Sequence, residues 1–420
     1  MTLSSLSAPL ALPCGAILQN RIAKAAMSEG LSDADGRATP RLEALYRRWA
    51  NSGAGLLLSG NIQVDPWHLE RPLNVVIHDD SGFEALSRLA AAGTSRGAHF
   101  WAQISHTGRQ VDAKINPAPV APSSVEIQVI RGVGYEFATP KAMTQGEIET
   151  AIAQFAFSAA RVKAAGFTGV QLHAAHGYLI SQFLSSLSNR RTDQWGGPLA
   201  NRSRFLLEAL AAVRAAVGPG FPLSIKLNAS DFQKGAYTNA ECVALVGMLN
   251  HTTLDLLELS GGSLEQPKQV GVAFRDEGED ARPESTRKRE AYFIGFAGAV
   301  KAAARMPVMV TGGFRTVAGM IEAVEGGETD VVGLGRPMIA DPDTPRRILS
   351  GEIEKTLTPE ADIDLFHLMG WNNMQLERLG DGLEPDLALR GEEAAGQFKA
   401  LERDNFAALL GNRRAAGRAA

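Results

Sequence analysis

Short apolar runs alternate along the chain with longer segments whose apolar positions recur at helical spacing. Eight of these runs, rich in Val, Ile and Leu, are candidate strands: residues 21–27, 55–62, 100–105, 169–174, 223–227, 254–259, 308–311 and 331–334. Because the runs are continuously apolar, they are typical of parallel strands that are buried on both faces. Between them, residues 148–165 and 203–217 are the clearest of the segments that predict helices covering the outside.

Eight units of strand followed by helix predict an α/β fold of the (β/α)8, or TIM-barrel, type. The rival is a doubly wound open sheet. It is disfavoured because no Gly-x-Gly-x-x-Gly follows a candidate strand and no Gly-x-x-x-x-Gly-Lys-Ser/Thr phosphate loop occurs. We expect residues 1–355 to form the barrel. The β/α alternation then stops, and residues 356–420 predict a helical C-terminal extension whose basic end, 412–420, is frayed.

Two connections are longer than the loops of a barrel usually are. Residues 110–145 are rich in Pro, Val and Gly, and residues 262–290 are dense in charge. They follow the third and sixth candidate strands, so both leave the face on which barrel enzymes carry their active sites. We expect lids or walls of a substrate site, the first of them as an insertion that caps the barrel.

Composition restricts the class of partner. The chain is 45% hydrophobic and 21% charged, with a formal net charge of −4. It has no basic stripe of the kind that nucleic acid or an anionic membrane requires, and no apolar run of membrane-spanning length. We therefore expect small-molecule partners, no nucleic acid and no membrane, with a homo-oligomer left open.

The two cysteines, Cys14 and Cys242, exclude a disulfide framework, a Cys-x-x-Cys zinc site and a four-cysteine iron–sulfur cluster. Pro9 and Pro13 interrupt the first apolar stretch and no basic segment precedes it, which argues against a signal peptide. These features favour a cytoplasmic location.

Polar side chains are densest after the fourth candidate strand, where the hexapeptide 173–178 reads His-Ala-Ala-His-Gly-Tyr. The imidazole N–H groups of His173 and His176 suit an oxygen that gains negative charge, and the phenol of Tyr178 suits proton donation. Taken alone, the hexapeptide is equally compatible with a strand cap whose histidines bond to backbone carbonyls. A metal site on the two histidines is disfavoured, because carboxylates at the strand ends are limited to Asp231 and Glu258. We expect no metal.

The other strand ends indicate a cofactor. Gln103 offers both a donor and an acceptor to the edge of a flat heteroaromatic ring. Lys226 lies in an apolar run, so it should face an anion in the barrel mouth unless it extends to solvent. Glycine-rich turns follow the last two strands, Gly312-Gly313 and Gly335-Arg336, where barrels commonly bind phosphate. An amide, a cation and a phosphate site describe a seat for flavin mononucleotide (FMN). The alternative is an aldolase that uses Lys226 as its Schiff-base nucleophile.

Together these motifs resemble the Old Yellow Enzyme family of FMN-dependent ene-reductases, which are NADH:flavin oxidoreductases. The resemblance extends over residues 18–342. The segments that carry it are 20–22 (NRI), 103–109 (QISHTGR), 173–180 (HAAHGYLI), 188–193 (SNRRTD) and 201–205 (NRSRF), in this order.

The resemblance implies that FMN lies across the barrel mouth. The residues that it assigns to the flavin are Ala25, Ala26, Met27 and Ser28 at its edge, Gln103 on its pyrimidine and Lys226 near its N1–C2 carbonyl. The residues that it assigns to the phosphate are Gly312, Gly313, Gly335 and Arg336.

The resemblance also implies an activity, the reduction of activated C=C bonds. His173 and His176 would bind the activating carbonyl or nitro oxygen, flavin N5 would deliver hydride, and Tyr178 would protonate the neighbouring carbon. NADH or NADPH would then reload the flavin in the same pocket. A flavin-dependent dehydrogenase or demethylase of the same fold is the alternative.

Three positions depart from the family pattern. Lys226 stands where many relatives have arginine, which keeps the charge but loses the planar fork. Ser28 stands at a redox-tuning position that is often threonine or cysteine. Asn61 replaces the small residue usual at the end of the second strand, which adds an amide near the reactive edge of the flavin. The resemblance therefore gives no expectation for the reduction potential of the flavin in this chain.

Overall fold

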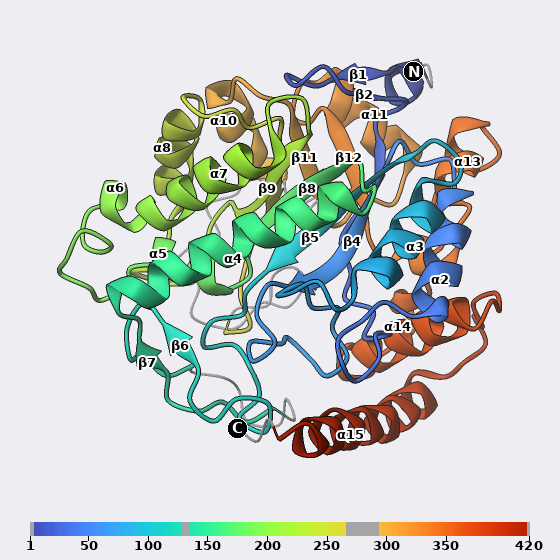
Figure 1. Cartoon of the computed structure of the whole chain (residues 1–420). Helices are drawn as coiled ribbons and strands as arrows, with labels where there is room; N and C mark the ends of the chain where they lie inside the picture. The colour runs from blue at the N-terminus through green and yellow to red at the C-terminus, as the bar shows by residue number, and fades with distance from the viewer. Residues whose placement is uncertain (1–3, 128–134, 266–293, 418–420) are drawn as a thin grey trace.

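Eight parallel strands close into a barrel in the computed structural model, which describes residues 4–127, 135–265 and 294–417 (Figure 1). The barrel strands are β3 (Ile22–Lys24), β4 (Leu56–Gln63), β5 (His99–Ser105), β8 (Gly169–Ala174), β9 (Leu223–Asn228), β10 (Leu256–Ser260), β11 (Val308–Thr311) and β12 (Val331–Leu334). Each strand pairs with the next barrel strand along the chain, and β12 pairs with β3 to close the ring. The predicted (β/α)8 barrel is confirmed, and the doubly wound alternative is excluded.

Helices surround the barrel. They are α1 (Ser4–Ser7), α2 (Pro40–Ala50), α3 (Phe83–Thr94), α4 (Gln145–Ala164), α5 (Leu179–Leu184), α6 (Leu199–Arg202), α7 (Arg204–Val217), α8 (Asn239–Leu249), α10 (Ile294–Ala303), α11 (Val317–Glu325), α12 (Pro337–Ala340) and α13 (Thr344–Leu349). Local sequence sets their ends: Thr144 and Glu147 form a capping box at the start of α4, and Gly218, with φ of 78°, ends α7.

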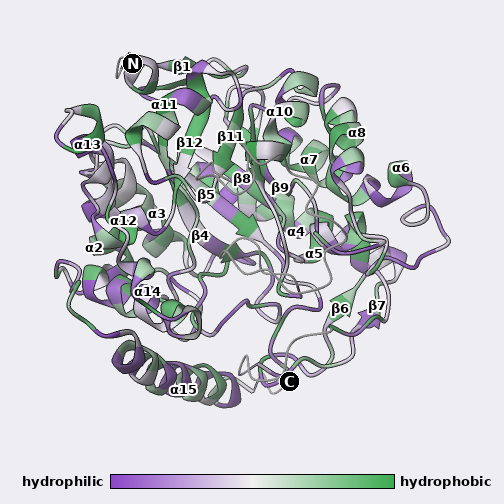
Figure 2. Cartoon of the chain, turned by 180° about the vertical axis from the view of Figure 1, so that it is seen from behind, coloured by the Kyte–Doolittle hydropathy of each residue, from purple (hydrophilic) through white to green (hydrophobic). Residues whose placement is uncertain are grey.

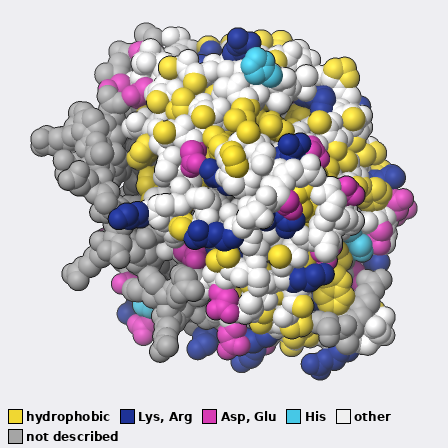
Figure 3. Space-filling view, turned by 90° about the vertical axis from the view of Figure 1, so that its left-hand side faces the viewer, with side chains coloured by type: hydrophobic (Ala, Val, Ile, Leu, Met, Phe, Trp, Pro, Cys, Tyr) yellow, Lys and Arg dark blue, Asp and Glu magenta, His cyan; other side chains and the backbone are white. Residues whose placement is uncertain are grey.

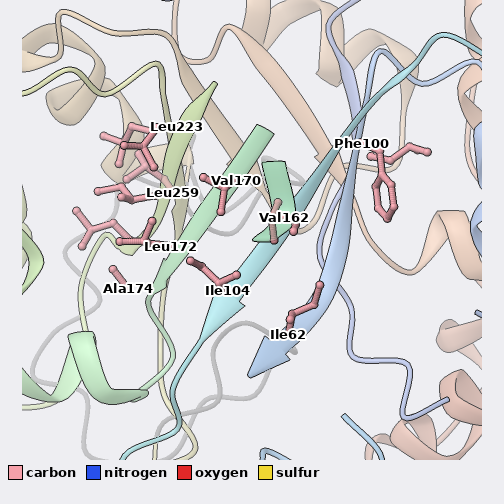
Figure 4. Packing of buried hydrophobic residues seen from close by; sticks show 14 of the residues in the cluster. Ile62, Phe100, Ile104, Val162, Val170, Leu172, Ala174, Leu223 and Leu259 are labelled. Carbon is pink, nitrogen blue, oxygen red and sulfur yellow. The ribbon is translucent and has the colours of Figure 1, made fainter. Parts of the chain in front are cut away.

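Apolar side chains on the outer surface of the strands pack against the helices. Figure 4 shows Val170, Leu172 and Ile104 of the strands beside Val162 of α4, all of them buried. This packing explains why the strands are continuously apolar in sequence.

The amino-terminal end of the barrel is closed by the antiparallel pair β1 (Leu10–Ala11) and β2 (Ile17–Leu18). Leu12 and Leu18 form one apolar cluster with Trp101, Leu256 and Met309 from inside the barrel. Figure 1 shows this pair at the opposite end of the molecule from the insertion that follows β5. A site for a ligand therefore lies at the carboxyl ends of the strands.

The insertion of residues 110–145 carries the two-stranded parallel sheet of β6 (Val120–Ala121) and β7 (Lys141–Ala142). Arg191 holds it in place, since the guanidinium donates to the carbonyl oxygens of Pro122 and Met143. The second long connection, 262–290, lies outside the described residues from 266 onward.

The first barrel strand is shorter than the predicted 21–27. Only Ile22–Lys24 form a strand, although Ala25 N–H still donates to Leu334 O at 2.8 Å. Beyond Ala25 the chain bends toward the end of β4, where Met27 O would lie 2.4 Å from a Cβ added at Gly60. This close approach of two backbones ends the strand pairing and requires glycine at position 60.

The C-terminal extension consists of a short 3-10 helix, η2 (Pro359–Ala361), followed by α14 (Leu365–Gly380) and α15 (Gly391–Ala415). Helix α14 packs on α2, and α15 packs on α14 (Figure 1). Hydrophilic and hydrophobic positions alternate along α15, as expected for a helix with one face against the protein (Figure 2).

Residues 412–415, which the sequence pattern predicted to be frayed, are helical. Asn412 Nδ2 donates to Ala34 O at 3.1 Å, and the Arg413 guanidinium lies 4.4 Å from the centre of the Trp67 ring. Arg413 also donates to Ile115 O at 2.7 Å. The basic end is thus ordered by carbonyl acceptors and an aromatic ring that are distant in sequence.

No helix in the described ranges is long and apolar enough to cross a membrane. On the side of the molecule in Figure 3, basic and acidic side chains are interspersed with apolar and neutral ones. That face carries mixed charge, in keeping with the nearly balanced composition.

Lys24 is a fully buried ammonium group between the barrel and α2. Its Nζ donates to Leu58 O at 2.7 Å and lies 4.2 Å from the centre of the Trp49 ring. Burial lowers the pKa of Lys24 to about 7, and the negative charge of Glu29 only partly opposes this shift. Near neutral pH the folded protein therefore holds this proton much more weakly than the unfolded chain does.

We predict that Lys24→Met flattens the pH dependence of stability. Between pH 7 and the ordinary lysine pKa of about 10.4 the unfolded chain binds the proton that folded Lys24 has lost, so the free energy of unfolding rises with pH. From pH 7 to 9.5 this contribution is on the order of 3 kcal/mol. Urea unfolding at both pH values measures it, with exposed Lys399→Met as the control. Equal slopes for Lys24→Met and the native chain would contradict the assignment.

Candidate active site

Side chains that point into the barrel change from apolar to polar toward the carboxyl ends of the strands. On β5, Trp101 is followed by Gln103, and on β10, Leu256 is followed by Glu258. The strand register brings the polar groups to one level, because Lys226 on β9 is paired with both His173 on β8 and Glu258 on β10. In the same way Gln103 pairs with Gln171.

These polar groups form one buried network. Gln103 Nε2 donates to Gln171 Oε1 at 2.6 Å, and Gln171 Nε2 donates to Glu258 Oε2 at 2.9 Å. Lys226 Nζ lies 3.0 Å from Glu258 Oε1, and the Thr311 hydroxyl donates to the same oxygen at 2.7 Å. Sequence reasoning missed Glu258 as the partner of Lys226, although it had noted this carboxylate at a strand end.

The two histidines of the hexapeptide are brought together by a left-handed turn. His176 has φ of 61° and Gly177 has φ of 78°, so the turn uses two left-handed residues and not only the glycine. The His176 N–H is held by Asn228 Oδ1 at 3.1 Å, and the His173 and His176 ring centres are 5.0 Å apart. The strained backbone of His176 therefore serves to place its ring.

A hydrogen bond defines the tautomer of His173, and burial sets the charge of both histidines. Ala175 N–H donates to His173 Nδ1 at 3.2 Å, which leaves the proton of His173 on Nε2. His176 Nε2 lies 2.7 Å from the Ser260 hydroxyl. Burial, reinforced by the positive charge of Lys226, lowers the pKa of both imidazoles well below the ordinary range. Both histidines are thus neutral near pH 7.

The Tyr178 phenol completes this group. Its ring centre lies 4.7 Å from that of His173, edge to face, and the residue is 6% exposed. Burial raises the pKa of Tyr178 well above its ordinary value, as do the charge of Glu70 and a hydrogen bond to that carboxylate. A hydrogen bond with Asn61 acts in the opposite direction. The phenol therefore keeps its proton near neutral pH.

Glu70 links three residues of the predicted site. Its Oε2 accepts from Asn61 Nδ2 at 2.6 Å and from the Ser28 hydroxyl, and its carboxylate accepts from Tyr178. A register shift in β4 between Leu58 and Asn61 places the Asn61 side chain here. Sequence reasoning missed Glu70, because it lies in an irregular loop that carries no periodic signal.

The glycine turns lie on neighbouring strands, since β12 is flanked by β11 and β3. Gly312 and Gly313 have φ of 116° and 90° and need glycine for their backbone conformation. Gly335 does not have a left-handed φ, and a Cβ added there would meet nothing closer than Met27 Sδ at 3.8 Å. A methyl group would thus fit at Gly335 without a clash, so neither its backbone conformation nor its neighbours require glycine there.

Positive charge accompanies these turns. Arg336 Nη1 lies 3.9 Å from Glu360 Oε1 of η2, and Arg315 pairs more closely with the same oxygen. Both guanidinium groups thus lie on one carboxylate oxygen beside the glycine turns, and guanidinium groups bind phosphate well. Arg315 and Glu360 carry no motif and were not predicted.

The residues present fit FMN. Gln103 and Lys226 supply an amide and a cation, and the turns at 312–313 and 335–336 supply a phosphate site. Asn61 Oδ1 is buried without a hydrogen-bond partner among the described residues, so the site retains an acceptor for a ligand. At the end of β3, Ala25 is buried and uses its N–H within the barrel, whereas Ala26, Met27 and Ser28 are partly exposed.

Asp65, His68 and His106 form a separate cluster with metal-ligand chemistry. The imidazole rings are stacked with centres 4.2 Å apart, and His68 Nδ1 lies 2.9 Å from Asp65 Oδ1. Val120 N–H donates to His68 Nε2, and Gly108 N–H donates to His106 Nδ1. Burial lowers the pKa of His106 to about 3. Through these hydrogen bonds the cluster stabilises the loops after β4 and β5.

A model of the NADH:flavin oxidoreductase / NADH oxidase family matches residues 5–355. The chain belongs to this family. The resemblance to Old Yellow Enzyme is thereby confirmed, with FMN as the cofactor and NADH or NADPH as the reductant that the family implies.

Relatives of known name support this assignment. The chain is 35% identical over 380 residues to an NADH-dependent flavin oxidoreductase of Aspergillus parasiticus, covering 87% of this chain and 83% of that protein. It is 35% identical over 386 residues to a protein of the same description from Neonectria sp., covering 85% of this chain but 49% of the relative. The chain thus spans only about half the length of the latter protein.

Among solved structures, a 2-naphthoyl-CoA reductase in complex with 2-naphthoyl-CoA is similar, with a TM-score of 0.78 and 27% sequence identity. The alignment covers 90% of this chain and 58% of that one. The barrel of this flavin oxidoreductase is therefore shared with an enzyme that carries further sequence.

We predict that Glu258→Ala destabilises the protein by roughly 3–5 kcal/mol, because it leaves the Lys226 ammonium buried without its partner. Glu258→Gln keeps the shape of the side chain and the contact with Thr311, so it should lower the free energy of unfolding by less. Adding Lys226→Met to Glu258→Ala should recover part of the loss. Urea unfolding with and without added FMN measures these differences. A loss below about 1 kcal/mol for Glu258→Ala would show that the ion pair is not needed.

Proposed function

We propose that this flavin oxidoreductase reduces activated C=C bonds, as in enones, enals and nitroalkenes, with hydride that NADH or NADPH has delivered to FMN in a ping-pong cycle. One observation carries the proposal: two neutral imidazoles and a neutral phenol converge on the barrel mouth whose walls fit FMN. Such a group can bind an oxygen and protonate a carbon of one substrate.

The residues that would hold FMN come from five strand ends. Gln103 and Lys226 would bind the ring, the turns at 312–313 and 335–336 with Arg336 would bind the phosphate, and residues 25–28 would border the ring. Bound FMN would supply the chemistry of hydride transfer, from nicotinamide and then to the alkene.

The histidines would bind the activating oxygen of the substrate. His173 offers Nε2–H. His176 offers Nδ1–H in the tautomer in which its Nε2 accepts from the Ser260 hydroxyl, 2.7 Å away. Because burial keeps both rings neutral, they polarise the oxygen as hydrogen-bond donors and add no full charge to the site.

Tyr178 would donate the proton to the carbon next to the activating group. Its raised pKa holds the proton on the phenol oxygen until the carbon becomes strongly basic. Tyr178 as a whole is 6% exposed, which also limits proton delivery from bulk water. The protonation is thereby confined to one face of the substrate.

The Schiff-base aldolase is disfavoured by the contacts of Lys226. Its Nζ lies 3.0 Å from Glu258, and an ammonium in a buried ion pair is a poor nucleophile. A flavin-dependent dehydrogenase or demethylase would use the same cofactor seat in the oxidative direction. A panel of enones, nitroalkenes and amines, with NADH and NADPH compared in stopped-flow reduction of the flavin, separates these activities. A colourless protein that forms a borohydride-trapped adduct at Lys226 would overturn the flavin proposal.

We predict that His176→Ala lowers the rate of enone reduction on the order of 10²-fold, the effect of losing one donor to a charged oxygen. Phenolic ligands should also bind more weakly, which titration of the flavin charge-transfer band measures. Unchanged affinity for phenols would contradict an oxygen-binding role.

We predict that Tyr178→Phe slows oxidation of the reduced enzyme by an enone and leaves reduction by NADH nearly unchanged, because only the first of these half-reactions consumes the proton. Stopped-flow absorbance of the flavin follows each half-reaction separately. Equal losses in both would indicate a structural role for the phenol.

A further inference from the structure

Glu70 lies next to Tyr178, the proposed proton donor, and its carboxylate contacts several residues of the site. It lies close enough to Tyr178 that its charge and a side-chain hydrogen bond add to burial in raising the pKa of the phenol. It also accepts from Asn61 Nδ2 at 2.6 Å and from the Ser28 hydroxyl. Tyr178 is buried, whereas Glu70 is partly exposed. Glu70 is thus a partly exposed carboxylate next to a buried proton donor.

Each turnover removes one proton from Tyr178, and the proton must return before the next alkene is reduced. The phenol is 6% exposed, so water reaches it poorly. A carboxylate beside a newly formed phenolate becomes more basic, because two negative charges in contact repel each other. Glu70 is therefore suited to bind a proton from solvent at that moment.

We propose that Glu70 is the relay that returns a proton from solvent to Tyr178. This inference rests on the proposed alkene reduction. The O–H bond of Tyr178 breaks as the C–H bond of the product forms, which leaves a phenolate. Glu70 then takes a proton from water and passes it to the phenolate oxygen, which restores the phenol and the carboxylate. One solvent proton is consumed for each alkene, and no electrons move in these steps.

The C-terminal helices hold the relay in place. Asn74 Oδ1 accepts from the backbone N–H groups of Glu70 and Arg71 at 2.9 and 3.1 Å, which fixes the turn. Arg71, 5% exposed, pairs with Glu402 of α15 and donates to Asn373 of α14. The C-terminal extension thereby holds Arg71, the residue next to Glu70, in place.

Arg71 is further enclosed by aromatic and backbone contacts. Its guanidinium lies 5.1 Å from the centre of the Phe398 ring of α15. The guanidinium also lies against Gly30, where an added Cβ would come within 2.6 Å of Arg71 Cζ. Residues of α14, α15 and the loop at Gly30 thus surround the side chain next to Glu70.

The experiment compares Glu70→Gln and Glu70→Asp in the FMN-loaded enzyme. Glutamine keeps the shape of the side chain but has no acidic proton to pass on. We expect unchanged FMN affinity and unchanged reduction by NADH for Glu70→Gln. Its steady-state enone reduction should fall on the order of 10²-fold, with a larger solvent deuterium isotope effect and a rate that decreases as pH rises. The first turnover of pre-reduced enzyme should stay fast, because Tyr178 starts protonated.

Two further measurements separate relay from support. Added acetate or imidazole buffer should restore turnover of Glu70→Gln in proportion to the concentration of the acid form. Glu70→Asp retains a carboxyl group, so its turnover should lie between that of the native enzyme and that of Glu70→Gln. Glu352→Gln is the matched control, since Glu352 is an exposed glutamate that pairs with Arg347 at 2.8 Å and contacts none of the residues of the relay. It should behave as the native enzyme.

The outcomes distinguish the two proposals. Absence of enone reduction by the native enzyme would overturn the proposed function. If the native enzyme reduces enones, native turnover and pH profile in Glu70→Gln would overturn the relay alone. The relay would also be overturned if Glu70→Gln lowered FMN affinity or reduction by NADH as much as it lowers enone reduction. A residue that only supports the cofactor site would affect all three quantities.

Discussion

The ion pair of Lys226 and Glu258 occupies the level at which the barrel interior changes from apolar to polar. Neither charge is stable there alone, because removing an ion from water costs several kcal/mol unless a partner and further hydrogen bonds replace the solvent. Glu258 meets this condition by accepting from Gln171 and Thr311 as well as from Lys226. Four adjacent strands, β8 to β11, are thereby tied at one height.

This arrangement also positions the groups above it. Gln103 is oriented because Gln171, its acceptor, is itself held by Glu258. His173 is paired in register with Lys226, and its imidazole stays neutral chiefly because it is buried, with the nearby cation adding to this effect. Burial and charge thus act together on the site: the ammonium that suits an electron-rich ring also helps to keep the neighbouring histidines from binding a second proton.

Hydrophobic pattern alone predicted the eight strands, because each is buried on both faces and reads as a continuous apolar run. The hexapeptide at 173–178 was also visible, since its polar residues follow such a run directly. The departures have tertiary causes. The first strand ends early where Met27 O approaches Gly60. Arg413 stays helical because its guanidinium lies over the Trp67 ring and donates to Ile115 O.

Glu70 shows why part of a site escapes sequence reasoning. Its contact with Asn61 depends on a register shift inside β4, and its contact with Tyr178 depends on a left-handed turn after β8. Neither feature changes the period of the apolar positions, so neither leaves a local signal. Chemistry that arises from two irregular backbones becomes visible only when both are placed in space.

The C-terminal extension bears on the site through the same loop. The family model ends at residue 355, yet Asn373, Phe398 and Glu402, whose side chains contact the Arg71 guanidinium, lie after it. A buried guanidinium that lost these partners would be strongly unfavourable, so α14 and α15 cannot move away without moving the turn that carries Glu70. The extension is therefore coupled to the barrel mouth by a buried charge, and the geometry around Tyr178 depends on helices outside the family barrel.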